Sequence, residues 1–463
     1  MNQSRRIDKY LRNYGVRDDR PITVSSIDGI RRSVVIPVYS ELSHVFRTLS
    51  SISQNPPEDL STTLVVCVVN NHGPHLSSET DIYDNQRTLK ILKLLASGHL
   101  PSSVPPEIAP EDLHAIAKSN LRLACIDASS PVLEIPDRDG GVGTARKIGM
   151  DAALRLMDGS GACGGVILCL DADTLVEQNY VSAVCNHFEG TRNPGAVVSF
   201  AHRMPADLAL RNAICNYEIF LRAYVMGLSF AGSPYAFHSI GSAMACTAEG
   251  YTSVRGMNRK EAAEDFHFLN KLAKIGTIGA IHETTVFPSP RISHRVPFGT
   301  GRQMNLVMTA GQEGCRFHHP DTFLVLKEWL ECIAADPDRD PETILTAAGE
   351  IHPLLLEFLR MNRFETCWEK IRLNCSDSKH LIKQFHVWFD GLMTLRLIHH
   401  LSRSSCFPTV AAIDALAGLF GHMGVAISFV RETSCGVFEN DLEIEILNVL
   451  RSRLNHAVPT RSS

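Results

Sequence analysis

The stretch GVILCLDAD, residues 165–173, decides the fold class of this chain. An apolar run of this kind predicts a strand buried on both faces, as strands are in a parallel sheet. Two carboxylates, Asp171 and Asp173, follow the run directly. Because open α/β sheets bind ligands at the carboxyl ends of their strands, the stretch predicts both an α/β sheet and the place of its site.

Further strands and helices alternate around this stretch, as an α/β fold requires. Three more apolar runs predict strands, namely residues 33–39 (SVVIPVY), 63–71 (TLVVCVVNN) and 195–200 (GAVVSF). Apolar residues with helical spacing alternate with the strands, at residues 42–52, 144–157 and 178–188. The sequence therefore predicts an open α/β sheet. Residues 74–122, which contain a helical stretch and a proline-rich loop, are interpreted as an insertion at its edge.

The chain after about residue 310 has a different pattern, in which apolar residues recur three and four positions apart. We therefore expect an N-terminal helix and linker at 1–30, an α/β domain at 31–310 and an α-helical C-terminal domain at 311–463. The most apolar long stretch, 409–430, contains Asp414 and His422. Those polar residues favour a buried helix over one that spans a bilayer.

The composition narrows the function classes. Hydrophobic residues make up 44% of the 463 residues, which is typical of a globular protein and excludes a disordered or coiled-coil architecture. With 45 Lys and Arg against 50 Asp and Glu, the net charge of −5 argues against a dedicated nucleic-acid binder. The thirteen cysteines lie partly in apolar runs, and no apolar segment follows the basic N-terminus. We therefore expect reduced, mostly buried thiols in a cytoplasmic protein with at most peripheral membrane contact.

Asp171 and Asp173 have the chemistry of a cation site. In an extended chain alternate residues point to the same side, so both carboxylates can face one ligand. Hard oxygen ligands suit Mg²⁺ or Mn²⁺, which commonly bridges to substrate phosphates. The alternative is structural, since aspartate is also favoured at helix N-caps and in turns.

Two other segments have the chemistry to serve the same site. Residues 140–149 (GGVGTARKIG) join a glycine-rich loop to a helix start, whose backbone N–H groups favour an anion. The order of residues is not that of a P-loop, and no GxGxxG follows the first strand, which argues against a dinucleotide fold. Glu264 and Asp265 are in a helical context and are candidates for a general base. The structural alternatives are a loop that closes the helix onto the sheet and a pair that complements the helix dipole.

Together these segments resemble the family 2 glycosyltransferases of the GT-A fold, over about residues 31 to 300. The matching motifs follow the family's order along the chain: residues 35–41 (VIPVYSE), 143–149 (GTARKIG), 171–173 (DAD), 241–245 (GSAMA), 255–257 (RGM) and 264–265 (ED). Three departures are present. Ser40 and Lys147 each stand where the family has Asn, and the second strand ends in Asn70 and Asn71 where the family commonly has an Asp that reads the base.

The resemblance implies a role for each matching position. The nucleotide-sugar side would comprise Pro37, Tyr39, Glu41, Asn71, Arg146, Lys147 and Asp171. The metal side would comprise Asp173, Asp171 and a third ligand, for which His294 is the first candidate and His282 the alternative. The acceptor side would comprise Gly241, Ser242, Arg255 and Gly256, followed by a flexible loop with Arg295, Gly299, Gly301 and Arg302. Asp265, beside Glu264, would be the catalytic base of an inverting enzyme.

The resemblance thus implies a glycosyltransferase, more narrowly a hexosyltransferase, that uses Mg²⁺ or Mn²⁺. It would move a sugar from a UDP- or GDP-linked donor to a saccharide, lipid-linked or small-molecule hydroxyl. No QxxRW motif is present, which argues against a membrane-embedded processive synthase. The alternatives are a catalytically degenerate scaffold or carbohydrate-binding subunit and a nucleotidyltransferase, which the sequence after the first strand disfavours. Retaining chemistry and homo-oligomerisation stay open.

Overall fold

The computed structural model describes residues 3–16, 20–72, 76–136, 140–157, 165–259, 263–291, 316–425, 444 and 446–451. The chain divides into two compact units. Unit 1 comprises Met1–Arg203 and Ser239–Gly301, and unit 2 comprises Met204–His238 and Arg302–Ser463. Residues 204–238 were expected in the α/β domain. They belong to the helical unit instead, because their helix buries Ile219 and Met226 in the same apolar core as Trp329.

Unit 1 is built on one sheet, with nine strands among the described residues. The strands are β1 (Ile22–Val24), β2 (Arg32–Val38), β3 (Thr63–Asn70), β4 (Arg122–Ala128), β5 (Val166–Cys169), β6 (Leu175–Val176), β7 (Gly195–Phe200), β8 (Met244–Thr247) and β9 (Ile278–Phe287). Their order is β1-β4-β3-β2-β5-β8-β7-β9-β6. Strands β4, β3, β2 and β5 are parallel, and β8 is antiparallel to β5 and β7. The predicted open α/β sheet is confirmed.

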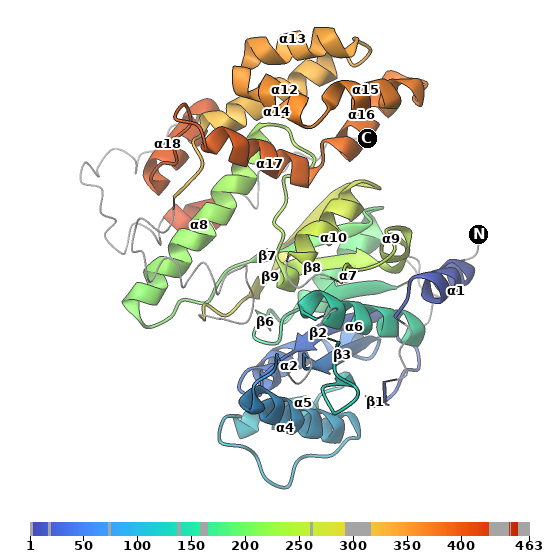
Figure 1. Cartoon of the computed structure of the whole chain (residues 1–463). Helices are drawn as coiled ribbons and strands as arrows, with labels where there is room; N and C mark the ends of the chain where they lie inside the picture. The colour runs from blue at the N-terminus through green and yellow to red at the C-terminus, as the bar shows by residue number, and fades with distance from the viewer. Residues whose placement is uncertain are drawn as a thin grey trace. The chain divides into compact units, whose positions relative to one another are not determined.

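Helices cover this sheet (Figure 1). They are α1 (Gln3–Asn13), α2 (Val45–Ser53), α3 (Pro57–Leu60), α4 (Glu79–Ala96), α5 (Pro110–Lys118), α6 (Val142–Leu156), α7 (Tyr180–Gly190), α9 (Ala248–Ser253) and α10 (Glu264–Ala273), with a short 3₁₀ helix η2 (Gly241–Ala243). The chain steps outward from β2 to β4 and then back to β5, so right-handed crossovers place α2 to α5 on one face and α6 on the other. Helix α6 packs tightly on β2, because a Cβ at Gly149 would lie 2.5 Å from a methyl carbon of Val35.

The described part of the expected insertion at 74–122, residues 76–122, belongs to the α/β pattern and is not an insertion into it. Helices α4 and α5 connect the parallel strands β3 and β4, and β4 was not predicted from the sequence. Parallel strands end at the same edge of a sheet, so β2, β3, β4 and β5 end together. Strands β7 and β9 end there as well, and β8 begins there. We call this edge of unit 1 the carboxyl edge.

The described residues of unit 2 are helical, apart from a β-bridge between Phe317 and Val410 and the connecting turns (Figure 1). The helices are α8 (Leu208–Phe230), α12 (Asp321–Ala335), α13 (Pro341–Ile351), α14 (Pro353–Met361), α15 (Phe364–Leu373), α16 (Ser378–Trp388), α17 (Gly391–Ser402) and α18 (Ala412–His422). The ring of Trp329 contacts Phe364, Phe385 and Phe389 at centroid distances of 5.6, 5.7 and 6.2 Å. The predicted all-α C-terminal region is confirmed.

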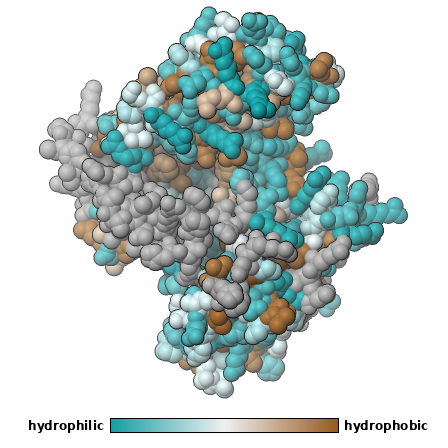
Figure 2. Space-filling model, in the orientation of Figure 1, coloured by the Kyte–Doolittle hydropathy of each residue, from teal (hydrophilic) through white to brown (hydrophobic). Residues whose placement is uncertain are grey.

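The burial of the thiols and the polarity of the visible surface are those of a globular protein. Cys67, Cys125, Cys169 and Cys246 are buried, as predicted. In the part of the chain that the structure describes, no helix has the length and apolar character needed to cross a membrane. The view in Figure 2 shows a mostly hydrophilic surface on which apolar residues are scattered singly or in small groups.

Candidate active site at the carboxyl edge

Asp171 and Asp173 follow β5 in a turn, in which the backbone N–H of Thr174 donates to the carbonyl oxygen of Asp171 at 3.1 Å. An extended chain was expected here, with both carboxylates facing the same way. The turn changes that geometry, and each carboxylate has its own arginine partner. Asp171 pairs with Arg146, and Asp173 pairs with Arg291.

Arg146 connects two of the predicted motifs. Its Nη2 pairs with Asp171 Oδ1, and its Nη1 pairs with Glu264 Oε1. Arg146 and Glu264 are each only 3% exposed. The guanidinium lies against Gly241, where a Cβ would be 2.3 Å from Nη2, so any side chain there would displace the guanidinium. Burial opposes the charge of Arg146, but Asp171 and Asp265 outweigh it and the pKa of Arg146 is raised.

Asp265 is the second residue of α10 and is partly exposed. One of its oxygens accepts a hydrogen bond from the backbone N–H of Phe266 at 2.7 Å. Burial raises the pKa of Asp265, although the nearby charge of Arg146 works in the opposite direction. Glu264 is thus committed to a buried ion pair, whereas Asp265 is the carboxylate of this pair that could meet a substrate.

Arg291 connects Glu41, after β2, with Asp173, after β5. Its Nε lies 2.8 Å from Asp173 Oδ2, and its Nη2 pairs with Glu41 Oε1. Burial raises the pKa of Asp173 to about 6, while the charge of Arg291 lowers it. Arg203 Nη2 donates to the backbone carbonyl of Asp173 at 3.0 Å. Neither arginine was predicted from the sequence, although each follows a strand, β7 or β9, at the carboxyl edge.

Tyr39 and Asn71 are held by residues of neighbouring segments. Tyr39 Oη donates to Asp81 Oδ2 at 3.3 Å. Asn71 Nδ2 donates to the carbonyl oxygen of Ser129 at 2.8 Å, and Asn71 Oδ1 accepts from Asn85 Nδ2. Both the amide nitrogen and the amide oxygen of Asn71 bond to protein atoms, and the residue is only 2% exposed. Its side chain therefore connects neighbouring segments of the edge and is not available to bind a nucleobase.

Lys147 belongs to a buried network with the N-terminal helix. Its Nζ lies 2.7 Å from Tyr10 Oη and 3.3 Å from Asp151 Oδ2. The Asp151 carboxylate also accepts from the hydroxyls of Tyr10 and Tyr251 and from the backbone N–H of Val16, at 2.7 to 2.8 Å. Burial lowers the pKa of Lys147. Lys147, which was expected on the nucleotide-sugar side, therefore has its partners in α1 and α6. The partners of Arg146, in contrast, lie at the carboxyl edge.

The acceptor-side candidates fall into two places. Gly241 and Ser242 lie in η2 at the carboxyl edge, and the buried Ser242 hydroxyl has no hydrogen-bond partner among the described residues. The guanidinium of Arg255 lies over the ring of Tyr14, 5.1 Å from its centroid. Gly256 lies against the hydroxyl of Tyr10. Arg255 and Gly256 thus contact the N-terminal segment. Pro37, from the donor-side set, is buried in β2.

Within the ranges that the structure describes, no group of three or more His, Cys, Asp or Glu side chains is arranged to hold a metal ion. His282 Nδ1 instead lies 3.1 Å from Ser199 Oγ. The first-choice ligand and the predicted loop lie outside the described residues, namely His294, Arg295, Gly299, Gly301 and Arg302. Glu41 and Asp173 do fit a cation, because their oxygens converge on one guanidinium and Mg²⁺ often uses only one or two carboxylates plus substrate phosphates.

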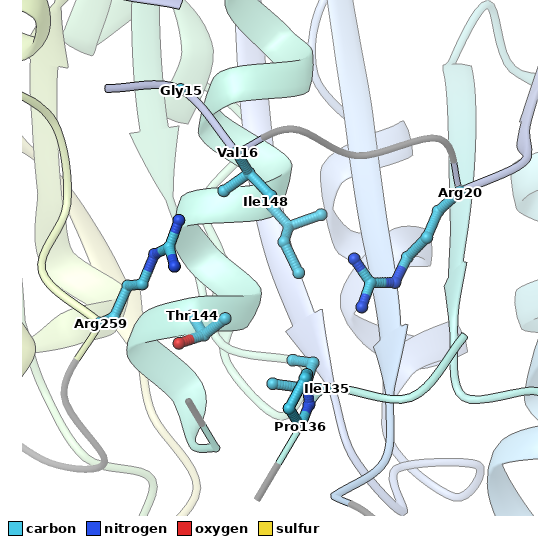
Figure 3. Close-up of a pocket in the computed structure, with 8 residues that line it drawn as sticks. All are labelled: Gly15, Val16, Arg20, Ile135, Pro136, Thr144, Ile148 and Arg259. Atoms are coloured by element: carbon cyan, nitrogen blue, oxygen red, sulfur yellow. The ribbon is translucent and has the colours of Figure 1, made fainter. Parts of the chain in front are cut away.

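A cavity of about 440 Å³ lies beside the first turns of α6. Its lining is Gly15, Val16, Arg20, Ile135, Pro136, Thr144, Ile148 and Arg259. Figure 3 shows Thr144 and Ile148, from α6, between the guanidinium groups of Arg20 and Arg259. None of the carboxylates of the carboxyl edge lines this cavity, so it is distinct from the cluster around Arg146 and Arg291.

No protein-family model matches the chain, and no curated protein sequence matches it. Solved structures do show similarity. One is residues 1–349 of TarS from S. aureus in complex with UDP-GlcNAc, which is 12% identical over 77% of this chain and 91% of that chain, with a TM-score of 0.34. Another is the mannosyltransferase PcManGT from Pyrobaculum calidifontis in complex with GDP-Man and Mn²⁺, which is 16% identical over 82% and 92% of the two chains, with a TM-score of 0.33. At such scores the likeness carries no weight for function, which has to be inferred from this chain's own residues.

Proposed function

We propose that this chain is a glycosyltransferase of the GT-A type, which transfers a hexosyl group from a nucleoside-diphosphate sugar to an acceptor hydroxyl. The observation that supports this most strongly is the position of Arg146. Arg146 lies in the first turns of α6, after the glycine-rich loop. Its guanidinium pairs with the Asp171 carboxylate after β5 and with Glu264 at the start of α10. The glycine-rich helix start, the turn at 171–173 and the start of α10 are far apart in the sequence. Arg146 joins all three at the carboxyl edge, where α/β folds bind ligands.

The donor would bind along this edge. Its diphosphate would lie near the first turn of α6, where Gly141 is the N-cap and the backbone N–H groups favour an anion. Arg146 would position the Asp171 carboxylate at this edge, because its buried guanidinium pairs with both Asp171 and Glu264. Tyr39, after β2, would offer a ring to the nucleoside. Asn71 and Lys147 are left out of the proposal, because protein partners occupy their side chains.

Glu41 and Asp173 would hold the divalent cation, Mg²⁺ or Mn²⁺. When bound, such a cation neutralises the charge that develops on the departing diphosphate. The protein's own part is to keep the two carboxylates convergent, as they are in their shared pairing with Arg291. The backbone N–H groups at the start of α6 would stabilise the same leaving group as preorganised partial charge.

Asp265 would take the proton of the acceptor hydroxyl in an inverting reaction. Its pKa is raised by burial, which brings a carboxylate closer to the range in which a general base works best. The Phe266 N–H fixes one of its oxygens and leaves the other to meet the hydroxyl. Gly241 and Ser242 lie at the same edge and would contact the acceptor or the transferred sugar.

Release of nucleoside diphosphate from UDP-glucose and GDP-mannose tests the proposal. The protein would be incubated with each donor and Mn²⁺, with and without a panel of saccharide acceptors. Asp265→Asn should lower the rate by about 10² to 10⁴ fold, the usual contribution of a general base, and leave donor binding in place. The matched control is Asp28→Asn, an exposed aspartate of the same unit. Donor binding without release by the wild-type chain would instead favour the carbohydrate-binding or scaffold alternative.

A further inference from the structure

A single guanidinium, that of Arg291, binds the two carboxylates that would hold the cation. Glu41 and Asp173 follow different strands and are both largely buried, with side chains that are 9% and 16% exposed. Two carboxylates in this position would repel each other without a positive charge between them. Arg291 provides that charge, with Nε at 2.8 Å from Asp173 Oδ2 and Nη2 paired with Glu41 Oε1.

A divalent cation and the Arg291 guanidinium would compete for these carboxylate oxygens. If both stayed, the two carboxylates would face three positive charges, and the excess would disfavour the cation. Moving Arg291 away from both carboxylates loses two ion pairs, which another anion can replace. The diphosphate of the donor is such an anion, since the guanidinium fork matches phosphate oxygens in a bidentate arrangement. The side chain of Arg291 is 25% exposed, so it has room to reorient.

We propose that Arg291 is an internal counter-ion that holds the place of the divalent cation until the donor arrives. The inference rests on the proposed function and concerns the regulation of the same site. The cation and the diphosphate enter together, because the diphosphate takes over the arginine that the cation displaces. The chain therefore binds the cation weakly by itself and binds it much more tightly in the presence of a nucleoside diphosphate.

Titration of the full chain with Mn²⁺, with free Mn²⁺ followed by electron paramagnetic resonance, tests this without any turnover. Each titration is run alone and with UDP or GDP. For the wild type we expect the better nucleotide to tighten Mn²⁺ binding by about tenfold or more, which corresponds to about 1.4 kcal/mol. Arg291→Gln removes the counter-ion, so Mn²⁺ alone should bind about tenfold more tightly than to the wild type. The nucleotide should then tighten Mn²⁺ binding less than it does in the wild type, because only direct ligation by its phosphates remains.

The controls separate this role from a general loss of charge. Arg291→Lys retains the charge without the fork and should stay close to the wild type for Mn²⁺ alone. Arg32→Gln breaks a pair of the same kind, 2.7 Å from Asp59 at the opposite end of β2, and should leave both titrations unchanged.

Two results would overturn the inference, and they can be told apart. Unchanged or weaker Mn²⁺ binding by Arg291→Gln, with the nucleotide effect intact, would refute the counter-ion while the proposed function stands. If the folded wild type bound neither Mn²⁺ nor a nucleotide, the proposed function would fail and the counter-ion with it.

Discussion

Arg146, in α6, and Asp171, in the turn after β5, form an ion pair at the carboxyl edge, although they are 25 residues apart in the sequence. The same guanidinium satisfies Glu264, which is almost fully buried. The donor site and the candidate base are therefore held by one residue. A buried carboxylate left without its partner is costly, so this arrangement makes a stability prediction as well as a functional one.

Arg146→Ala should lower the free energy of unfolding of unit 1 by about 3–5 kcal/mol, because it leaves Glu264 buried and unpaired. Urea unfolding followed by far-ultraviolet circular dichroism measures the loss. Arg6→Ala is the matched control, since Arg6 pairs with Glu249 at the surface and such pairs contribute about 0–1 kcal/mol. Equal effects of the two substitutions would show that Arg146 is not the structural centre of the site.

Tyr10→Phe should destabilise unit 1 by about 1–3 kcal/mol, because it removes the hydroxyl that donates to Asp151 and accepts from the buried Lys147. Tyr14→Phe removes a hydroxyl from the same segment, but its side chain is 42% exposed and the change should stay within about 0.5 kcal/mol. Hydrogen exchange of α1 and α6 provides the measurement. If protection of α6 survived Tyr10→Phe unchanged, the N-terminal helix would not be part of this network.

Local sequence patterns predicted the central sheet and the place of the site, because apolar runs and the carboxylates that follow them are local features. Strands 63–70 and 195–200 agree with the predicted stretches to within a residue. Strand β4 was missed, since Arg122 and Asp127 interrupt its apolar character. With β4 unrecognised, α4 and α5 were taken for an insertion.

The partners of the site residues could not be predicted in the same way, because they depend on contacts distant in sequence. Lys147 meets Tyr10, 137 residues away, and Glu41 meets Arg291, 250 residues away. The resemblance placed Lys147 on the nucleotide-sugar side, whereas the fold provides it with a hydroxyl and a carboxylate. Asp171 and Asp173 illustrate a second limit, since the spacing of two residues does not distinguish an extended chain from a turn.

Glu218→Gln should destabilise unit 2 by several kcal/mol. Glu218 is fully buried in α8 and accepts from Arg222 at 2.7 Å and from Arg451 at 2.8 Å. Neutralising it leaves two guanidinium groups without their shared anion, at a cost of about 3–5 kcal/mol. All three tryptophans, Trp329, Trp368 and Trp388, lie in this unit, so intrinsic fluorescence reports its unfolding alone.

Glu331→Gln is the control for that experiment, because Glu331 forms only an exposed pair with Lys327 at 3.8 Å. Its effect should be close to zero. A Glu218→Gln midpoint as close to the wild type as that of the control would contradict the buried ion triad.

Unit 2 should lose stability as the pH falls from about 6.5 towards 4. Burial, together with the neighbouring His399, lowers the pKa of His318 from 6.5 to about 4. Between these values the unfolded chain binds a proton that the folded chain does not, so acid favours unfolding. Tryptophan fluorescence in denaturant at pH 7 and pH 5 measures the slope. His318→Asn should flatten it, and His380→Asn, an exposed position on α16, should not.

The central claim is a cation-dependent nucleotide site at the carboxyl edge, and calorimetric titration of the full chain tests it most directly. UDP, GDP, UDP-glucose and GDP-mannose would each be titrated with Mn²⁺ and with EDTA, into the wild type, Asp173→Asn and the control Asp28→Asn. We predict that at least one nucleotide binds with Mn²⁺, that EDTA and Asp173→Asn abolish the heat, and that the control binds as the wild type does. Absence of binding to the folded wild type, or binding that Asp173→Asn and EDTA leave unchanged, would contradict the account.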